Sequence, residues 1–478
     1  MNTPKNDIYC NPLPLPDYPQ GMLCRHNKYQ PDCYIGTPAD YRELADPEML
    51  YCDGTWYMFP SCHQAYVSTD LAHWDYRPVI IDRELGYAPT IARFRGKFYL
   101  TSSTLYRAPG AWLYEAPAPL GPYRSLGEVR GPGGSALPTE YLDPTLFCDD
   151  DEHLYLYWGY GPDGGGIYGM ELDPAAPARG LMPPRRLLDF DGRNEFERFG
   201  DHHEHGDWGF LEGAAMFKHH GIYYLEYSAC GTVFRNYALG ICSAPTPLGP
   251  FTRQQEPLML TPHGIVCGTG HGGMVRGPED TVWQFYTTLV RRKGVFERRI
   301  GMDRVEFSAD GTVRVRATAT PQSVSRGDLG LVPVSVNKPV TVSSCRGEHW
   351  GNFANDDCTH TWFAPEKSDE TPFWEVNLRK DFDITAVRIL WCELNLDFRA
   401  GIVPEPVQFK IEFFDAEHRP LPGTVDARNN AADRIVDFRI FQPIRARFAR
   451  LTWQRGRKID IGLTECTIFA PPTPARTF

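Results

Sequence analysis

One short pattern occurs five times between residues 46 and 286 and constrains the fold more than any other feature of the chain. Each copy has a head residue, a first strand, a tight turn and a second strand rich in aromatic and apolar residues. The five heads are Asp46, Ala88, Asp143, Glu212 and Gly272. Their spacing suits the blades of a β-propeller, which take about 40–50 residues when no loop is enlarged. We therefore predict a five-bladed β-propeller, since an unrelated β-sandwich has no reason to repeat at this period.

The length of the chain, 478 residues, exceeds what one hydrophobic core needs, so we expect two domains. A content of 13% aromatic residues, with 44 Gly and 42 Pro, suits short strands joined by turns and predicts an all-β protein. We predict a Pro-rich arm over residues 1–40, the propeller over 41–316 and a linker over 317–334. Alternating patterns then predict a second all-β domain over 335–478, a jelly-roll-like β-sandwich.

The charge and the ends of the chain limit its partners and location. A formal net charge of -11 argues against nucleic acid and fits a neutral ligand such as a carbohydrate. No apolar run is long enough to span a membrane. The N-terminus shows no signal peptide, so we expect a cytoplasmic location, although a secreted chain whose signal has been removed would look the same. The 13 Cys lack metal-binding spacing and indicate free thiols. The sequence leaves the oligomeric state open.

Three of the five heads are acids. The first strand of every propeller blade lines the central channel, so the heads should meet at one end of it, and Asp46, Asp143 and Glu212 should converge there. Clustered acids repel one another, so at least one should have a raised pKa. Glycoside hydrolysis needs such a set: one protonated carboxyl, one ionised carboxylate and, in addition, a third acid that tunes the first. An Asp before Pro often only starts a turn, but an acid at one repeat position in three units favours catalysis.

Other residues near the heads have two interpretations each. His271 lies in the glycine-rich segment 268–273 and could ligate a metal or its water shell, or only hydrogen-bond within the channel. The segment 202–205, His-His-Glu-His, resembles a metal site in composition but lacks the spacing, so we expect a solvated loop. Trp208 and Tyr87 flank heads and could stack on a sugar ring or simply pack. The acidic run 149–152 should be a hairpin turn.

The motifs at the heads resemble glycoside hydrolase family 43, in order and in spacing. They are Ala45–Pro47, Asp143–Phe147, Leu211–Ala214 and Gly270–Gly272. The resemblance implies a five-bladed propeller and an inverting mechanism. It also implies roles: Asp46 as general base, Glu212 as general acid, and Asp143 as the modulator that holds the acid.

The same resemblance implies further site residues. His271 corresponds to a channel histidine that often lies near a bound calcium, while the chemistry itself needs no cofactor. Arg298 corresponds to a substrate-binding arginine of the last blade, although the usual Gly-Arg-Glu is here Glu297-Arg298-Arg299. In the C-terminal part, Asn352–Asp357 and Trp374–Leu378 resemble a discoidin-type (coagulation factor 5/8 type C) galactose-binding-like domain.

These inferences predict an exo-acting inverting hydrolase that releases a terminal pentose, α-L-arabinofuranose or β-D-xylose, from plant-type oligo- or polysaccharides. A galactofuranosidase or exo-galactanase of the same mechanism is the nearest alternative. A propeller phosphorylase would need a basic phosphate pocket and only one catalytic carboxylate. A lectin-like propeller would bind sugar without turnover, but mere binding gives three acidic heads no role.

Overall fold

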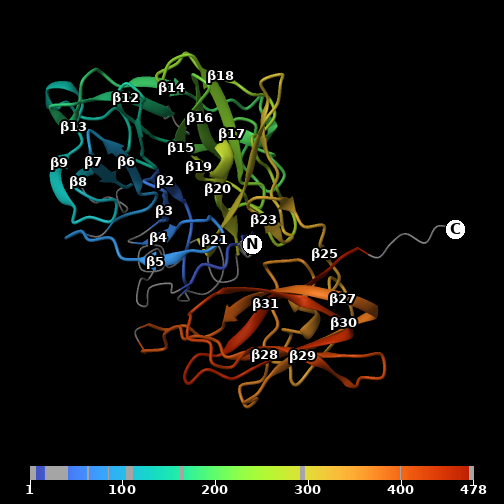
Figure 1. Cartoon of the computed structure of the whole chain (residues 1–478). Helices are drawn as coiled ribbons and strands as arrows, with labels where there is room; N and C mark the ends of the chain where they lie inside the picture. Colours follow the sequence, from blue (N-terminus) through green and yellow to red (C-terminus); the bar gives the residue numbers. More distant parts are fainter. Residues whose placement is uncertain are drawn as a thin grey trace.

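The computed structural model describes residues 7–16, 41–61, 64–83, 85–103, 111–161, 166–290, 296–398 and 400–472. Of the predicted N-terminal arm, only residues 7–16 lie within these ranges. The described chain is built from strands, and its helical segments are four short 3-10 turns (Figure 1). This confirms the prediction of an all-β protein.

Five antiparallel sheets follow one another along the chain, and each pairs its strands in sequence order apart from β14. The first strands of the sheets contact each other in a closed ring, β2 to β6, β6 to β10, β10 to β15, β15 to β19 and β19 back to β2. This ring confirms the five-bladed propeller. Blade I has β2 (Glu48–Cys52), β3 (Thr55–Phe59), β4 (Ala65–Ser68) and β5 (Asp75–Arg77). Blade II has β6 (Thr90–Phe94), β7 (Lys97–Thr101), β8 (Trp112–Ala116) and β9 (Arg124–Glu128).

The three remaining blades carry the enlarged intervals. Blade III has β10 (Thr145–Cys148), β11 (Leu154–Trp158), β12 (Ile167–Asp173), β13 (Ala176–Gly180) and β14 (Arg185–Leu188). Blade IV has β15 (Phe210–His219), β16 (Ile222–Cys230), β17 (Ala238–Ala244) and β18 (Thr252–Arg253). Blade V has β19 (Gly272–Arg276), β20 (Val282–Leu289), β21 (Arg298–Phe307) and β22 (Val313–Val315).

The turns between the first two strands explain why the repeat was visible in the sequence. Blades I, II and IV turn at glycines with left-handed backbone, of which Gly221 has a φ of 79°. Blade III uses the acidic run instead: Glu152 has a φ of 59°, and its backbone N–H donates to the Asp149 carbonyl. The run is therefore the hairpin turn that the sequence predicts.

Beyond the propeller, seven strands form what we call the C-terminal sheet. They are β25 (Val332–Pro333), β26 (Val340–Val342), β27 (Phe373–Glu393), β28 (Phe409–Phe414), β29 (Pro420–Ala427), β30 (Val436–Trp453) and β31 (Ile461–Ala470). All belong to one hydrogen-bonded network, which confirms the predicted second β-rich region, whereas its layering as a jelly-roll-like β-sandwich stays a prediction. The long strands β27 and β30 shift register between Asn377 and Phe382 and between Ile384 and Ala386. Such bulges bend strands, which the alternation of side chains alone does not reveal.

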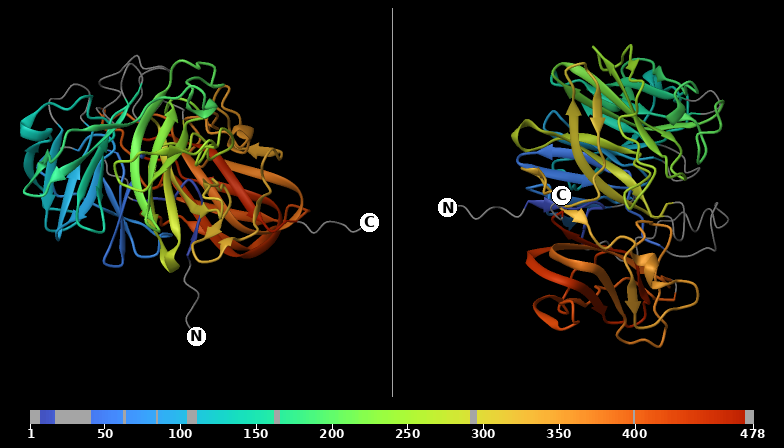
Figure 2. Two further views of the ribbon diagram at one scale, coloured as in Figure 1. Left: turned by 90° about the horizontal axis from the view of Figure 1, so that it is seen from above. Right: turned by 90° about the vertical axis from the view of Figure 1, so that its right-hand side faces the viewer.

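The propeller and the C-terminal sheet pack directly against each other. Tyr286 and Val315 of blade V share one buried cluster with Leu390 and Val436 of the C-terminal sheet. The predicted linker carries β23 (Gln322–Ser323), which pairs with β1 (Ile8–Tyr9) of the arm, and β24 (Gly327–Asp328), which pairs with β23. Figure 2 shows the C-terminal sheet, in orange and red, against the propeller from two further directions. In the described part of the chain, no helix is long and apolar enough to cross a membrane.

Candidate active site

The blade heads share an unusual backbone conformation. Asp46, Ala88, Asp143 and His271 have φ between 37° and 52°, the left-handed region that non-glycine residues rarely adopt. Such a conformation costs about 1–2 kcal/mol per residue and persists where the surrounding structure fixes it, often at functional sites. The fifth residue of this kind is Gly213, with a φ of 59°.

Two heads differ from the repeat alignment made on the sequence. In blade V the left-handed residue is His271 rather than Gly272, so this unit begins one residue earlier than the alignment assumes, in line with β19 starting already at Gly272. In blade IV a bulge shifts the register between Glu212 and Ala215. Glu212 therefore lies one residue before the left-handed position. A bulge adds a residue without changing the apolar pattern around it, so periodicity could not show this.

A ring of hydroxyl groups fixes the heads. In four blades, a Ser or Thr at or just beyond the end of the second strand accepts a hydrogen bond from the backbone N–H of the head of the next blade. The four contacts are Ala88 N to Ser61 Oγ (3.0 Å), Asp143 N to Ser103 Oγ (2.7 Å), His271 N to Ser228 Oγ (3.0 Å) and Asp46 N to Thr287 Oγ1 (2.9 Å). Blade III has Gly159 at this place, and there Gly161 N donates to the Leu211 carbonyl instead. The sequence reasoning missed these hydroxyls, although the recurrence of Ser or Thr near the end of the second strand in four of the five blades was a usable signal.

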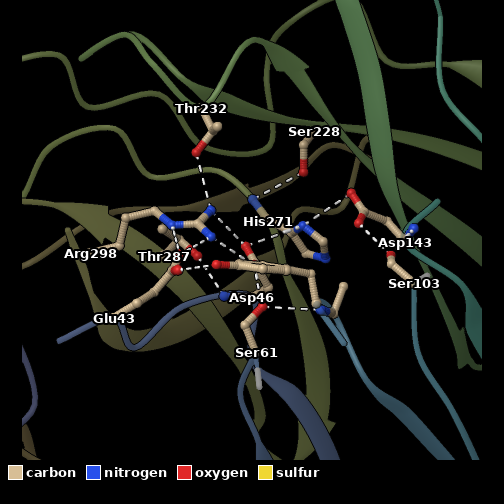
Figure 3. Close-up of polar contacts among 12 residues, drawn as sticks. Glu43, Asp46, Ser61, Ser103, Asp143, Ser228, Thr232, His271, Thr287 and Arg298 are labelled. Carbon is tan, nitrogen blue, oxygen red and sulfur yellow. Dashed lines mark hydrogen bonds and ion pairs between the residues drawn. The ribbon is translucent and has the colours of Figure 1, made fainter. Parts of the chain in front are cut away.

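Asp46 lies in a dense set of hydrogen-bond donors (Figure 3). Arg298 donates from Nη1 to Oδ1 and from Nη2 to Oδ2, both at 2.9 Å, and Ser61 Oγ donates to Oδ2 at 2.5 Å. His271 Nδ1 lies 3.4 Å from Oδ1. Burial acts to raise the pKa of Asp46, but Arg298 and His271 outweigh it and hold the pKa below its ordinary value. Asp46 is therefore ionised.

Asp143 approaches Asp46 across His271. Its Oδ2 lies 3.5 Å from His271 Nδ1, and its Oδ1 accepts a hydrogen bond from Ser103 Oγ at 3.1 Å. Burial raises the pKa of Asp143 against the opposing charge of His271, and the negative charge of Asp46 adds to the rise. The imidazole thus links two of the predicted acids at one end of the channel.

Glu212, by contrast, has few donors. It is 9% exposed, and Tyr237 Oη donates to its Oε1 at 3.0 Å. Burial and then the charge of Asp143 raise the pKa of Glu212 to about 8. A carboxyl with this pKa is protonated at neutral pH and can donate a proton. The three acids that the sequence predicts to converge are thus electrostatically coupled in one site.

Arg298, predicted to bind substrate, lies in the site, but its described partners there include two carboxylates of the protein itself. Besides Asp46, it donates from Nε to Glu43 Oε1 at 2.7 Å and from Nη1 to Thr232 Oγ1 at 3.2 Å. Glu43 also accepts a hydrogen bond from Tyr87 Oη at 2.7 Å. The sequence reasoning missed Glu43, because it lies outside the repeated pattern.

The two predicted sugar-stacking residues lie in different surroundings. Tyr87 is partly buried, and its ring lies 6.2 Å from that of Phe296. Trp208 is partly buried and packs edge-on against Phe199 at 4.1 Å and Phe210 at 5.2 Å between ring centroids. Tyr87 is thus tied to the site through Glu43, whereas the described contacts of Trp208 are with other aromatic rings.

The site does not provide a protein-made cage for a metal. Among the described residues, no group of three or more His, Cys, Asp and Glu side chains is arranged to hold a metal ion. Calcium takes six to eight oxygen ligands, whereas Nδ1 of His271 faces the two carboxylates. The residues present do not fit a directly bound calcium. In the segment 202–205, His202, Glu204 and His205 are exposed, as expected of a solvated loop.

Comparison with known proteins agrees with this geometry. A β-D-galactofuranosidase of Aspergillus niger is 22% identical over 307 residues, covering 58% of this chain and 84% of that protein. A putative β-xylosidase of Escherichia coli is 25% identical over 303 residues, covering 58% of this chain and 49% of that protein. The chain thus spans about half the length of the latter relative.

Solved structures extend the likeness to the fold. A thermostable family-43 glycoside hydrolase superposes with a TM-score of 0.50 and 21% identity, covering 67% of this chain and all of that one. A structure described as a glycoside hydrolase covers 89% of this chain and 97% of its own, with a TM-score of 0.50 and 17% identity. The sequence model of glycosyl hydrolases family 43 matches residues 37–313. The chain therefore belongs to this family and is an inverting glycoside hydrolase.

Proposed function

We propose that this protein is an exo-acting inverting glycosidase that releases a terminal pentose, with Asp46 as general base, Glu212 as general acid and Asp143 as modulator. One observation carries the assignment. The environments of Asp46 and Glu212 move their pKa values in opposite directions, down for Asp46 and to about 8 for Glu212. Such a division is what an acid and a base in one site require.

The reaction follows from these protonation states. Asp46 accepts a proton from a water molecule, whose oxygen attacks the anomeric carbon. Glu212 donates its proton to the glycosidic oxygen as the bond to the leaving group breaks. Asp143 supports this step by keeping Glu212 protonated through charge repulsion. Inversion requires room for the water, so the two carboxyls should stand about 6.5–9.5 Å apart when substrate is bound.

No cofactor takes part in this scheme. The calcium near His271, the sugar-binding role of Arg298, Trp208, Tyr87 and His271, and the discoidin-like character of the C-terminal sheet are additional predictions. None of these predictions is needed for the acid–base chemistry.

The pentose preference rests on relatives. Besides the E. coli protein, a relative from Butyrivibrio fibrisolvens named as a xylosidase/arabinosidase is 26% identical over 274 residues. The name of the A. niger relative favours β-D-galactofuranose as a second candidate, because that protein is covered over most of its length. Furanose and pyranose sugars differ in ring size, so the same pocket should discriminate strongly between them.

A panel of nitrophenyl glycosides tests the proposal: α-L-arabinofuranoside, β-D-xyloside and β-D-galactofuranoside. We expect turnover of one of the first two, with the sugar released in the inverted anomeric form by NMR. Glu212→Ala serves as the control. Retention of configuration, or equal turnover by Glu212→Ala on every substrate, would contradict the proposed mechanism.

A further inference from the structure

A buried ionic cluster joins the propeller to the C-terminal sheet. Arg42, four residues before Asp46, donates to both carboxylate oxygens of Glu393, at 3.1 Å from Nε and 2.5 Å from Nη2. It also donates to both oxygens of Asp433, at 2.6 Å from Nη1 and 3.0 Å from Nη2. Arg42 is 2% exposed, and its two partners are 6% and 7% exposed. Arg42 is thus held by Glu393, at the end of β27, and by Asp433, in the loop that leads into β30; both belong to the C-terminal region.

Such a cluster needs an explanation beyond stability. A buried ion pair often stabilises a fold no better than apolar residues of the same volume, because both charges lose their hydration. Here the two domains also share an apolar core, so they do not depend on ions to associate. The planar guanidinium with four charged hydrogen bonds has one orientation only. What the cluster provides is a fixed position for Arg42.

That position is transmitted to the predicted base. Glu43, the next residue, accepts hydrogen bonds from Arg298, which in turn grips both oxygens of Asp46. The backbone is tied as well, because Arg299 Nη1 donates to the Arg42 carbonyl at 2.8 Å. Residues 42–43 and 298–299 are therefore linked twice, once through a side chain and once through the main chain.

We propose that the C-terminal sheet positions the general base: Glu393 and Asp433 fix Arg42, which sets Glu43, which orients Arg298 on Asp46. Glu43 and Arg42 are positioning residues, since neither needs to touch the substrate. The inference rests on the proposed role of Asp46. It makes the C-terminal sheet a structural part of the active site. Misplacement of a catalytic group by about 1 Å can cost up to about 100-fold in rate, so a remote anchor can matter.

The test compares two buried glutamates at opposite ends of one strand. Glu393 and Glu375 both belong to β27, and Glu375, 6% exposed, pairs with His418 and Arg450 within the C-terminal sheet. We expect Glu393→Gln to lower kcat by about tenfold or more with little change in KM. The acid limb of its kcat/KM profile should move to higher pH. The reason is that a displaced Arg298 lowers the pKa of Asp46 less, while His271, Asp143 and Glu212 remain in place. Glu375→Gln should lose comparable thermal stability yet keep the wild-type kcat and profile.

A second arm tests the middle of the chain of contacts. Glu43→Gln should reproduce the loss of kcat, and the double variant with Glu393→Gln should lose no more than the larger single loss, since both act through Arg298. Should Glu393→Gln fail to fold, Arg42→Lys keeps the charge, removes the planar fork and is expected to show the same kinetic changes.

The outcomes separate this inference from the proposed function. An inactive wild-type protein, or an active Asp46→Asn variant, would contradict the proposed function. An active wild type in which Glu393→Gln and Glu375→Gln have equal kcat and equal acid limbs would overturn the positioning role alone. Additive losses in the double variant would likewise show that Glu393 does not act through Glu43.

Discussion

Asp46 and Glu212 both place a carboxyl group at the ring of blade heads, but their surroundings have opposite effects on the pKa. On one side, the Asp46 carboxylate accepts hydrogen bonds from Arg298 and Ser61, and His271 lies 3.4 Å away. On the other, Tyr237 donates a hydrogen bond to Glu212, and the negative charge of Asp143 is the charge that raises the pKa of Glu212 most. Both groups are buried. Burial alone would raise both pKa values, so the neighbours decide which acid keeps its proton.

This difference shows that the neighbouring residues, rather than the type of the residue itself, decide which carboxyl group acts as acid and which as base. The propeller supplies equivalent positions around one axis, and the residues next to each position then make them chemically unlike. The strongest test of this difference replaces each of the two carboxyl groups in turn by the corresponding amide, which does not titrate.

The largest effects are expected from Asp46→Asn and Glu212→Gln. Each should lower kcat by about 10²- to 10⁴-fold on a disaccharide, since general acid and base catalysis each contribute that much. The two should separate on a dinitrophenyl glycoside. Its leaving group needs no protonation, so Glu212→Gln should recover most of its rate while Asp46→Asn should not. Steady-state kinetics on the two substrates measures this.

Circular dichroism spectra that match the wild type serve as the control for folding. If Asp46→Asn recovered on the dinitrophenyl substrate and Glu212→Gln did not, the two roles would have to be exchanged.

A smaller effect should come from the hydroxyl ring. Ser61→Ala and Ser228→Ala each leave the buried N–H of a head residue, Ala88 or His271, without its acceptor. Each should lower the free energy of unfolding by about 1–3 kcal/mol, measured by urea denaturation. Ser61→Ala should in addition lower kcat, because Ser61 also donates to Asp46, whereas Ser228 contacts Tyr237 on the Glu212 side. A kcat of Ser61→Ala equal to that of the wild type would show that the Ser61 hydroxyl does not support the base.

The sequence was sufficient for the propeller and for the three acids, and physical reasons explain where it failed. A repeated unit marks equivalent positions around an axis, so Asp46, Asp143 and Glu212 could be brought together without coordinates. Glu43 and Arg42 belong to no repeat, and their partners are far away in the chain. The bulge at Glu212 adds one residue without disturbing the apolar pattern.

The C-terminal sheet was harder for a related reason. Its strands alternate in the ordinary way, so strand positions such as Val340–Val342 were predictable. Alternation is the same whether strands form one sheet or two. The bent pairing of β27 with β30 depends on register shifts that leave no trace in composition.

The finest test of the comparison shifts the pKa of Glu212 in both directions. Glu212 must be protonated to act, so kcat/KM should fall as the pH rises through about 8. Asp143→Asn removes a negative charge, makes ionisation of Glu212 easier and should move this basic limb to lower pH, by about one unit for about 1.4 kcal/mol of lost repulsion. Tyr237→Phe removes a donor that favours the ionised form, so it should move the limb to higher pH.

The matched control for this last experiment is Tyr227→Phe, which removes a buried phenol from the same blade whose hydroxyl donates to Glu197. It should leave the limb in place. Movement of the limb in the same direction for Asp143→Asn and Tyr237→Phe would mean that the limb reports something other than Glu212. Because the three carboxyls titrate as a coupled set, the limb belongs to the set rather than to one group. Shifts of the basic limb in opposite directions for Asp143→Asn and Tyr237→Phe would therefore assign this limb to Glu212.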